Sequence, residues 1–136
     1  GLPIGAVVAD EKCADVFTRG MHGSTFGGNP VSAAAANYVL SIVDDAEFLN
    51  EVSAKGEELR KKIKEFNSPI VSEVRGKGLM IGVELTVDPH DIAVKAIDAG
   101  LIVLTAGKNV LRLLPPLTIT SSEMETGLKI LKKVLS

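Results

Sequence analysis

Hydrophobic and polar residues follow periods that change from segment to segment of this chain, and each segment predicts one element. Residues 4–9 form a short apolar run with β-branched side chains, which predicts a buried strand. Residues 11–18 predict a helical turn that packs Val16 and Phe17 inward. From residue 31 to about residue 43 the chain is rich in alanine, the strongest helix former, so we expect a helix there.

A longer helix is predicted from residue 46 to about residue 66. Apolar residues recur in it at spacings of three, four or seven, and charged residues fill the other positions. Gly56 lies on the apolar side, where the lack of a side chain indicates a close crossing with another element. The residues expected to face inward are Phe48, Val52, Leu59, Ile63 and Phe66.

A strand pattern follows this helix. Residues 73–78 predict an extended segment with a glycine bend, and residues 78–85 predict a strand in which apolar residues alternate with small or polar ones. The residues on its apolar face are Leu79, Ile81, Val83 and Leu85. Because only one face is apolar, this strand is expected in a sheet that helices cover on one side.

The last third of the chain predicts helix, two strands and helix. Asp88-Pro89 is a helix start, and Gly100 supplies the stop after about residue 99. Strands are expected at 101–104 and 110–114, joined by a turn at 106–109, and a final helix begins at 120–122 with a capping box. Residues expected to pack from these two helices are Ile92, Val94, Ala96, Ile97, Met124, Leu128, Leu131, Val134 and Leu135. The fold class is therefore α+β, with helices over a largely antiparallel sheet.

Composition narrows the function. The 136 residues amount to about one domain, with 46% hydrophobic and 24% charged residues. A net charge of −2, with both signs mixed along the chain, argues against nucleic acid and membrane surfaces as partners. One cysteine, Cys13, and two distant histidines, His22 and His90, make neither an internal disulfide nor a metal cluster. No leader and no long apolar span is recognised, so a reducing, cytoplasmic location is expected.

The first candidate site is the glycine-rich stretch His22-Gly23-Ser24-Thr25-Phe26-Gly27-Gly28-Asn29-Pro30. Asn29 and Pro30 form a helix start, with Asn29 as the N-cap. Glycines allow close backbone approach, the hydroxyls of Ser24 and Thr25 can donate hydrogen bonds, and a helix N-terminus favours negative charge. The stretch therefore suits an anion such as a phosphate, although a plain turn explains the same residues. A nucleotide is disfavoured, because no lysine follows the glycines as in a P-loop.

The second candidate is Arg112, which interrupts the apolar stretch 110–117. A buried charge requires a partner. One interpretation is a structural ion pair with Glu84 or Asp98. The other is that the planar guanidinium binds a substrate carboxylate in a bidentate manner. Residue types alone leave both open.

Three stretches resemble one family, and the resemblance extends over all 136 residues. The string from His22 to Pro30, the opening Gly1-Leu2-Pro3-Ile4-Gly5-Ala6 and the segment Leu111-Arg112-Leu113-Leu114-Pro115-Pro116-Leu117 are similar to segments of class III (ornithine-type) aminotransferases, most closely the acetylornithine aminotransferases among them. These enzymes are fold-type I proteins that use pyridoxal 5′-phosphate (PLP). The resemblance implies amino-group transfer from N-acetylornithine, or a related ω-amino acid, to 2-oxoglutarate, with glutamate as a product, and a role in arginine biosynthesis.

The resemblance also implies residue roles. Thr25 would hydrogen-bond the cofactor phosphate, Ser24 would lie beside it at the substrate, and Arg112 would bind the substrate carboxylate. In this family the loop serves the site of the partner subunit, so a homodimer is implied. Residues 1–43 would be a remnant of the large PLP-binding domain with the cofactor-phosphate loop, and residues 44–136 the small C-terminal domain.

No catalytic residue is assigned within the chain. The Schiff-base lysine of the family is expected upstream of Gly1, and Lys77, flanked by glycines, is expected to be exposed and unsuited to that role. Cys13 lacks a neighbouring base and is not expected to be a nucleophile. The isolated chain is therefore expected to be inactive. The alternative hypothesis is a stand-alone binding or oligomerisation module without catalysis.

Overall fold

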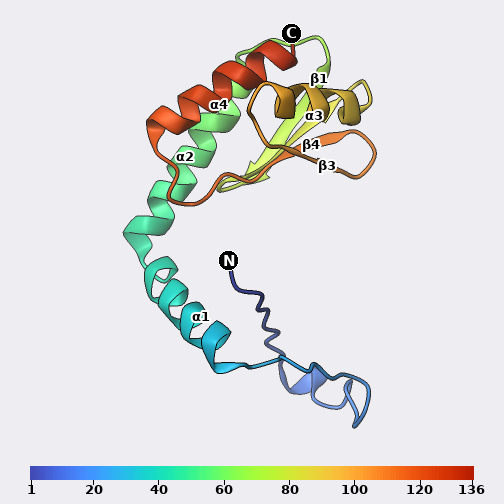
Figure 1. Ribbon diagram of the computed structural model, residues 1–136, viewed down its shortest axis with the longest axis vertical. Coiled ribbons are helices and arrows are strands. Elements are labelled where there is room, and N and C mark those ends of the chain that lie inside the picture. Colours follow the sequence, from blue (N-terminus) through green and yellow to red (C-terminus); the bar gives the residue numbers. More distant parts are fainter. The chain divides into compact units, whose positions relative to one another are not determined.

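The computed structural model describes all 136 residues, which form two compact units (Figure 1). The N-terminal unit is Gly1–Ala46 and the C-terminal unit is Glu47–Ser136. Each unit has its own local structure and is described by itself. None of the helices combines the length and the apolar character that crossing a membrane requires.

The first ten residues of the N-terminal unit contain no strand, so the prediction of a buried strand at residues 4–9 is wrong. The whole run is exposed, with Val7 at 90% and Val8 at 97%. A buried strand needs neighbouring strands to pair its N–H and C=O groups, and this unit contains none.

The predicted helical turn is short. It is the 3-10 helix η1 (Glu11–Cys13), capped by the side chain of Asp10, which accepts a hydrogen bond from the backbone N–H of Lys12 at 3.0 Å. Val16 and Phe17 are exposed, so the prediction that they pack inward is also wrong. Phe17 instead makes an edge-to-face contact with the ring of His22.

Helix α1 (Pro30–Val43) begins where the sequence predicts. Asn29 is the N-cap, and its side-chain oxygen accepts a hydrogen bond from the N–H of Ser32 at 2.9 Å. Pro30 occupies the first turn, where its missing N–H costs nothing. Asp44 ends the helix, with its N–H donating to the carbonyl of Leu40.

The C-terminal unit contains α2 (Ala46–Lys64, which begins at the last residue of the N-terminal unit), α3 (Pro89–Asp98), α4 (Ser121–Val134) and a four-stranded sheet. The strands are β1 (Val71–Lys77), β2 (Met80–Leu85), β3 (Leu104–Ala106) and β4 (Val110–Leu113). Their order in the sheet is β1-β2-β4-β3, and every neighbouring pair is antiparallel. The predicted α+β class, with helices over an antiparallel sheet, is confirmed.

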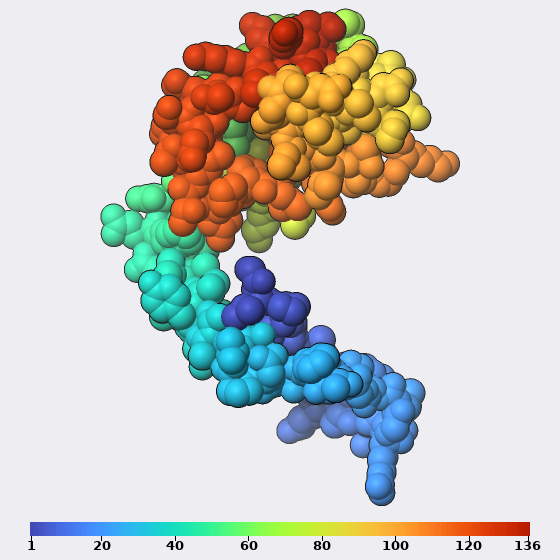
Figure 2. Space-filling view, viewed as in Figure 1, coloured from blue at the N-terminus to red at the C-terminus, as the bar shows by residue number.

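One face of this sheet carries the core. The alternating residues Leu79, Ile81, Val83 and Leu85 are at most 2% exposed, as the pattern predicts. They form one cluster with side chains from all three helices of the unit, among them Ile63, Ala96 and Leu131. Both α3 and α4 also reach the surface of the unit, where the space-filling view shows them (Figure 2). The three helices that contribute to this core pack on the same face, so none of them covers the opposite face of the sheet.

The predicted close crossing at Gly56 is confirmed. A Cβ at this position would lie 2.0 Å from the carbonyl oxygen of Gly78, in the turn between β1 and β2. The same carbonyl accepts a hydrogen bond from Nη1 of Arg60, one turn further along α2, at 3.2 Å. Helix and hairpin therefore touch through backbone.

Three details of the C-terminal unit differ from the predictions. Residues 71–77 form a full strand, because β2 pairs with them along their length. The strand predicted at 101–104 lies at 104–106, where it can pair with β4. In α3 the buried stripe runs through positions 89, 92, 93 and 96, so Val94 and Ile97 are exposed. The spacing of three and four residues decides this face, and those two residues lie outside it.

Candidate functional site

The glycine-rich loop before α1 is held by its own hydrogen bonds. The carbonyl of Phe26 accepts from the backbone N–H of Asn29 at 3.2 Å and from its side-chain Nδ2 at 3.0 Å. Gly28 has a φ of +70°, in the left-handed region that favours glycine. The loop is thus a defined turn that leads into the N-terminus of α1.

Ser24 and Thr25 lie at the exposed start of this turn. Neither hydroxyl bonds to another group of the protein, so both can donate to a ligand. Gly27 makes room for Ser24, because a Cβ there would lie 3.0 Å from Ser24 Cβ and 3.1 Å from its Oγ. Two free hydroxyls in a glycine turn before a helix N-terminus fit a phosphate group.

Arg112 lies in the middle of the sheet, on β4. It is directly opposite Gly82 on β2 and Leu104 on β3. The buried residues Leu111 and Leu113 flank it, so its side chain belongs to the face opposite the core. Its Nε is buried and has no hydrogen-bond partner.

The interpretation of Arg112 as one half of a structural ion pair is wrong, because it forms no salt bridge. Asp98 lies at the end of α3, a helix that packs on the other face of the sheet. Glu84 shares a face with Arg112 but pairs with Arg75. A guanidinium with a buried, unpaired Nε is costly in a folded protein, and a planar carboxylate is the ligand that would satisfy it.

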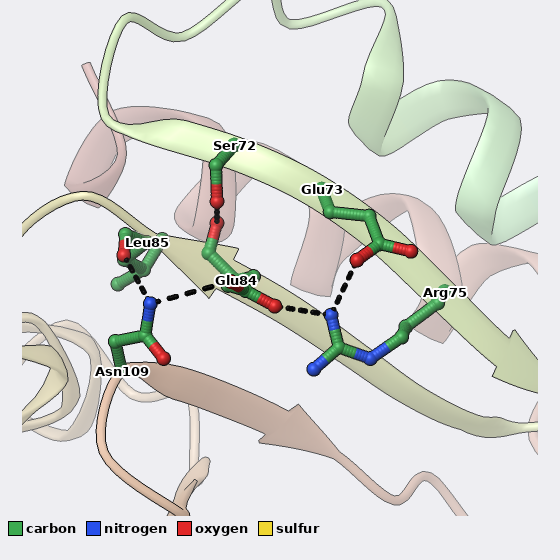
Figure 3. Close-up of polar contacts among 6 residues, drawn as sticks. All are labelled: Ser72, Glu73, Arg75, Glu84, Leu85 and Asn109. Atoms are coloured by element: carbon green, nitrogen blue, oxygen red, sulfur yellow. Dashed lines mark hydrogen bonds and ion pairs between the residues drawn. The ribbon is translucent and has the colours of Figure 1, made fainter.

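Glu84, one of the two acidic residues considered as a partner of Arg112, is part of a different network, shown in Figure 3. Nη1 of Arg75 donates to Oε2 of Glu73 at 2.7 Å and to Oε2 of Glu84. Nδ2 of Asn109 donates to the carbonyl of Leu85 at 2.9 Å and lies 3.5 Å from Oε1 of Glu84. The Arg75 guanidinium beside Glu84 holds the pKa of that carboxyl below its usual range, with a smaller lowering from Asn109.

The sequence prediction missed this network. The feature of the sequence that could have revealed the network is the alternation in residues 73–77, which places Glu73 and Arg75 on the polar face of a strand. That alternation is visible only if the segment is assigned as a strand, and the glycine at position 76 obscured it.

The remaining candidate residues all lie at the surface. Lys77 is exposed at the end of β1, His90 is exposed in the first turn of α3, and Cys13 is a free, exposed thiol. No cluster of three or more histidine, cysteine or acidic side chains could hold a metal ion. Ser24 and Thr25 belong to the N-terminal unit and Arg112 to the C-terminal unit.

Comparison with known proteins gives the family. The profile of class III aminotransferases matches residues 1–135. The acetylornithine aminotransferase of Bacillus subtilis is 44% identical over 137 aligned residues, which cover 100% of this chain and 36% of that enzyme. The ornithine aminotransferase of Staphylococcus carnosus is 42% identical over 135 residues, covering 99% of this chain and 34% of that enzyme.

Solved structures agree. The crystal structure of an acetylornithine aminotransferase from Elizabethkingia anophelis matches with a TM-score of 0.74 and 31% identity. The match covers 89% of this chain and 33% of that one. The fold of the chain thus matches a part of such an enzyme.

The chain belongs to the class III aminotransferase family. The enzymes of this family use PLP as their cofactor. The chain spans about a third of the length of the curated relatives that it matches.

Proposed function

We propose that the chain forms part of a PLP-dependent aminotransferase that transfers an amino group from N-acetylornithine, or a related ω-amino acid, to 2-oxoglutarate. The observation that carries this proposal is Arg112, whose guanidinium has a buried, unpaired Nε. Such a group on a strand of an aminotransferase chain is suited to hold a substrate carboxylate. Both the amino acids and the 2-oxoacids of the reaction carry one.

Arg112 would orient the substrate. Two parallel N–H···O bonds from a guanidinium define the plane and direction of a carboxylate, which a lysine cannot do. The carbon next to that carboxylate carries the amino or oxo group. Fixing the carboxylate therefore fixes the reacting carbon.

The loop would hold the cofactor phosphate. Thr25 would donate its hydroxyl to a phosphate oxygen, and Ser24 would lie beside it near the substrate. PLP, when bound, supplies an electron sink for the carbon that loses or gains the amino group. Since a site of the family is formed by two subunits, we propose a homodimer in which this loop serves the partner. We also propose a cytoplasmic location and a place in arginine biosynthesis.

The lysine that the family uses for covalent attachment of PLP is proposed to lie outside these 136 residues. About two thirds of the length of the relatives has no counterpart in the chain. We therefore expect no amino-group transfer from the 136 residues alone. Residues 1–43 are proposed to belong to the large cofactor-binding domain and residues 44–136 to the small domain.

The identity of the donor rests on similarity alone. The Bacillus subtilis acetylornithine enzyme and the Staphylococcus carnosus ornithine enzyme are 44% and 42% identical to the chain. That difference is small, so N-acetylornithine is preferred over ornithine only as the first substrate to test.

The experiment compares the 136-residue chain with a version extended at its N-terminus to the length of the relatives. Glutamate formation from N-acetylornithine and 2-oxoglutarate is measured for both, together with the dissociation constant for PLP. The proposal expects turnover and tight PLP binding from the longer protein only. Failure of the longer protein to bind PLP would overturn the proposal and favour a binding module.

Two variants of the longer protein test the residue roles. Arg112→Lys removes the bidentate geometry but keeps the charge, and should raise the KM for 2-oxoglutarate about 10- to 100-fold, the loss of about 1.5–3 kcal/mol for a charged hydrogen bond. Thr25→Ala should weaken PLP binding about tenfold and leave the KM for 2-oxoglutarate less affected. Lys77→Gln is the control, because Lys77 is exposed and has no assigned role. An unchanged KM in Arg112→Lys would contradict the assignment.

A further inference from the structure

The open face of the sheet carries three charged side chains near Arg112, which are Glu73, Arg75 and Glu84. Arg75, Gly82, Arg112 and Leu104 stand in one row across the four strands, since each is the registered partner of the next. Glu84 is registered with Val110, two residues from Arg112 on β4. Diagonal neighbours of this kind lie roughly 7–8 Å apart, within reach of long side chains. Glu84 is therefore the acidic residue best placed to neutralise Arg112.

Glu84 does not do so, because Arg75 holds its carboxylate. Oε2 of Glu84 accepts a hydrogen bond from Nη1 of Arg75, and Oε1 lies 3.5 Å from Nδ2 of Asn109. Both oxygens are thus directed toward β1 and toward the start of β4. Figure 3 shows this arrangement, in which the carboxylate of Glu84 lies between Arg75 and Asn109.

Gly82 separates the two arginines. It is the residue between Arg75 and Arg112 in the row, and it carries no side chain. A Cβ at this position would lie 3.2 Å from Cγ1 of Val110 and 3.9 Å from Cγ of Arg75. Gly82 itself therefore places no side chain between the two arginines, and the side chains of Val110 and Arg75 lie beside this position.

We propose that Arg75 is a positioning residue that withholds Glu84 from Arg112 and so keeps the Arg112 guanidinium available for a substrate carboxylate. This inference rests on the proposed role of Arg112. Without Arg75, Glu84 turns to Arg112 and competes with the substrate from within the protein. Glu73, the second acceptor of Arg75 at 2.7 Å, lies on β1 and does not compete.

A double variant separates this role of Arg75 from simple stabilisation of the sheet. Arg75→Gln frees the carboxylate of Glu84, and Arg75→Gln combined with Glu84→Gln removes the competitor as well. If Arg75 merely stabilised the sheet, the second substitution would add damage. If Arg75 withholds Glu84, the second substitution restores an unpaired Arg112.

The measurement is the NMR signal of the Arg112 Nε–Hε group in the 136-residue chain at pH 7, assigned from its absence in Arg112→Lys. In the Arg75→Gln variant the signal should shift without any ligand, as an ion pair with Glu84 forms. It should return to the position of the unmodified chain in the double variant. Glu73→Gln is the matched control and should leave the signal unchanged. An unshifted signal in Arg75→Gln would overturn the inference.

A titration with 2-oxoglutarate separates this inference from the proposed function. In the unmodified chain the ligand should shift the Arg112 signal. The apparent Kd should be weaker by about three- to tenfold in Arg75→Gln and recover in the double variant. One outcome is that 2-oxoglutarate shifts the Arg112 signal in no variant, although the signal still moves in ligand-free Arg75→Gln and returns in the double variant. In that case the proposed carboxylate role of Arg112 fails, and the pairing of Glu84 with Arg112 in the absence of Arg75 stands. If the ligand binds all variants equally, Arg75 has no part in recognition.

Discussion

Gly56→Ala is expected to destabilise the C-terminal unit, although alanine is the better helix former. The added Cβ would lie 2.0 Å from the carbonyl oxygen of Gly78 and 2.5 Å from its carbon. An ordinary carbon–oxygen contact is about 3.3 Å, so α2 and the β1–β2 turn must separate by roughly 1.3 Å. Both contact atoms are backbone, so no side-chain rotation relieves the overlap.

The cost follows from what α2 buries beside Gly56. Val52, Leu59 and Ile63 are each at most 8% exposed, and full burial of such a side chain is worth about 1.5–3 kcal/mol. A gap of about 1 Å forfeits up to half of the attraction across it, which amounts to about 2–4 kcal/mol for the three. The helix preference of alanine returns about 1 kcal/mol. The net loss in the free energy of unfolding is therefore about 1–3 kcal/mol.

The assay is urea unfolding of the 136-residue chain, followed by the intensities of backbone amide signals from residues 47–136. Gly127→Ala in α4 is the matched control, because its Cβ would make an ordinary 3.6 Å contact with Cδ1 of Leu101. That variant should be as stable as the unmodified chain, or more stable by up to about 1 kcal/mol. Equal stabilisation by both alanines would refute the backbone contact at Gly56.

Two further predictions concern acidic side chains. Helix α4 begins with a capping box, in which Thr120 Oγ1 accepts a hydrogen bond from the N–H of Glu123 and the Glu123 carboxylate accepts one from the N–H of Thr120. Thr120→Ala removes the first of these bonds and should lower the free energy of unfolding, measured in urea, by about 1 kcal/mol. Thr126→Ala, in the same helix but away from the cap, should cost less, and the reverse order would contradict the cap. The pKa of Glu84 is lowered, mainly by the hydrogen bond that Arg75 donates to it. The ionised Glu84 therefore stabilises the fold fully at a pH above the ordinary glutamate pKa of about 4.3. This contribution is lost as the pH falls through the lower pKa of the folded state. Arg75→Gln should raise the pKa of Glu84 in a carboxyl-carbon NMR titration, and an unchanged midpoint would show that the pair does not persist in solution.

The elements of the C-terminal unit were predictable because their signals are local or periodic. The alternation from Leu79 to Leu85 assigns a buried face without knowledge of its neighbours. Asn29-Pro30 and Asp88-Pro89 mark helix starts through the chemistry of their own side chains, and both caps are present. Gly56 could be recognised as a close crossing because it is the residue without a side chain on an apolar stripe.

The failures share one cause. An apolar, β-branched run such as residues 4–9 becomes a strand only where another strand pairs with it, and no such strand exists in its unit. Val94 and Ile97 are apolar but fall outside the stripe that packs α3 on the sheet. Which residues are apolar is a property of the sequence, whereas which of them are covered depends on neighbours.

For the candidate site, the sequence alone determined the family, the glycine loop with Ser24 and Thr25, and the presence of an arginine in an apolar strand. It could not determine the partner of Arg112. Glu84 and Asp98, both expected on neighbouring elements, were equally acceptable as partners of a buried charge. The tertiary structure shows that Glu84 pairs with Arg75 and that Asp98 lies on a helix at the opposite face. A charge pairs with what lies within a few ångströms in space, and that distance is a property of the tertiary structure.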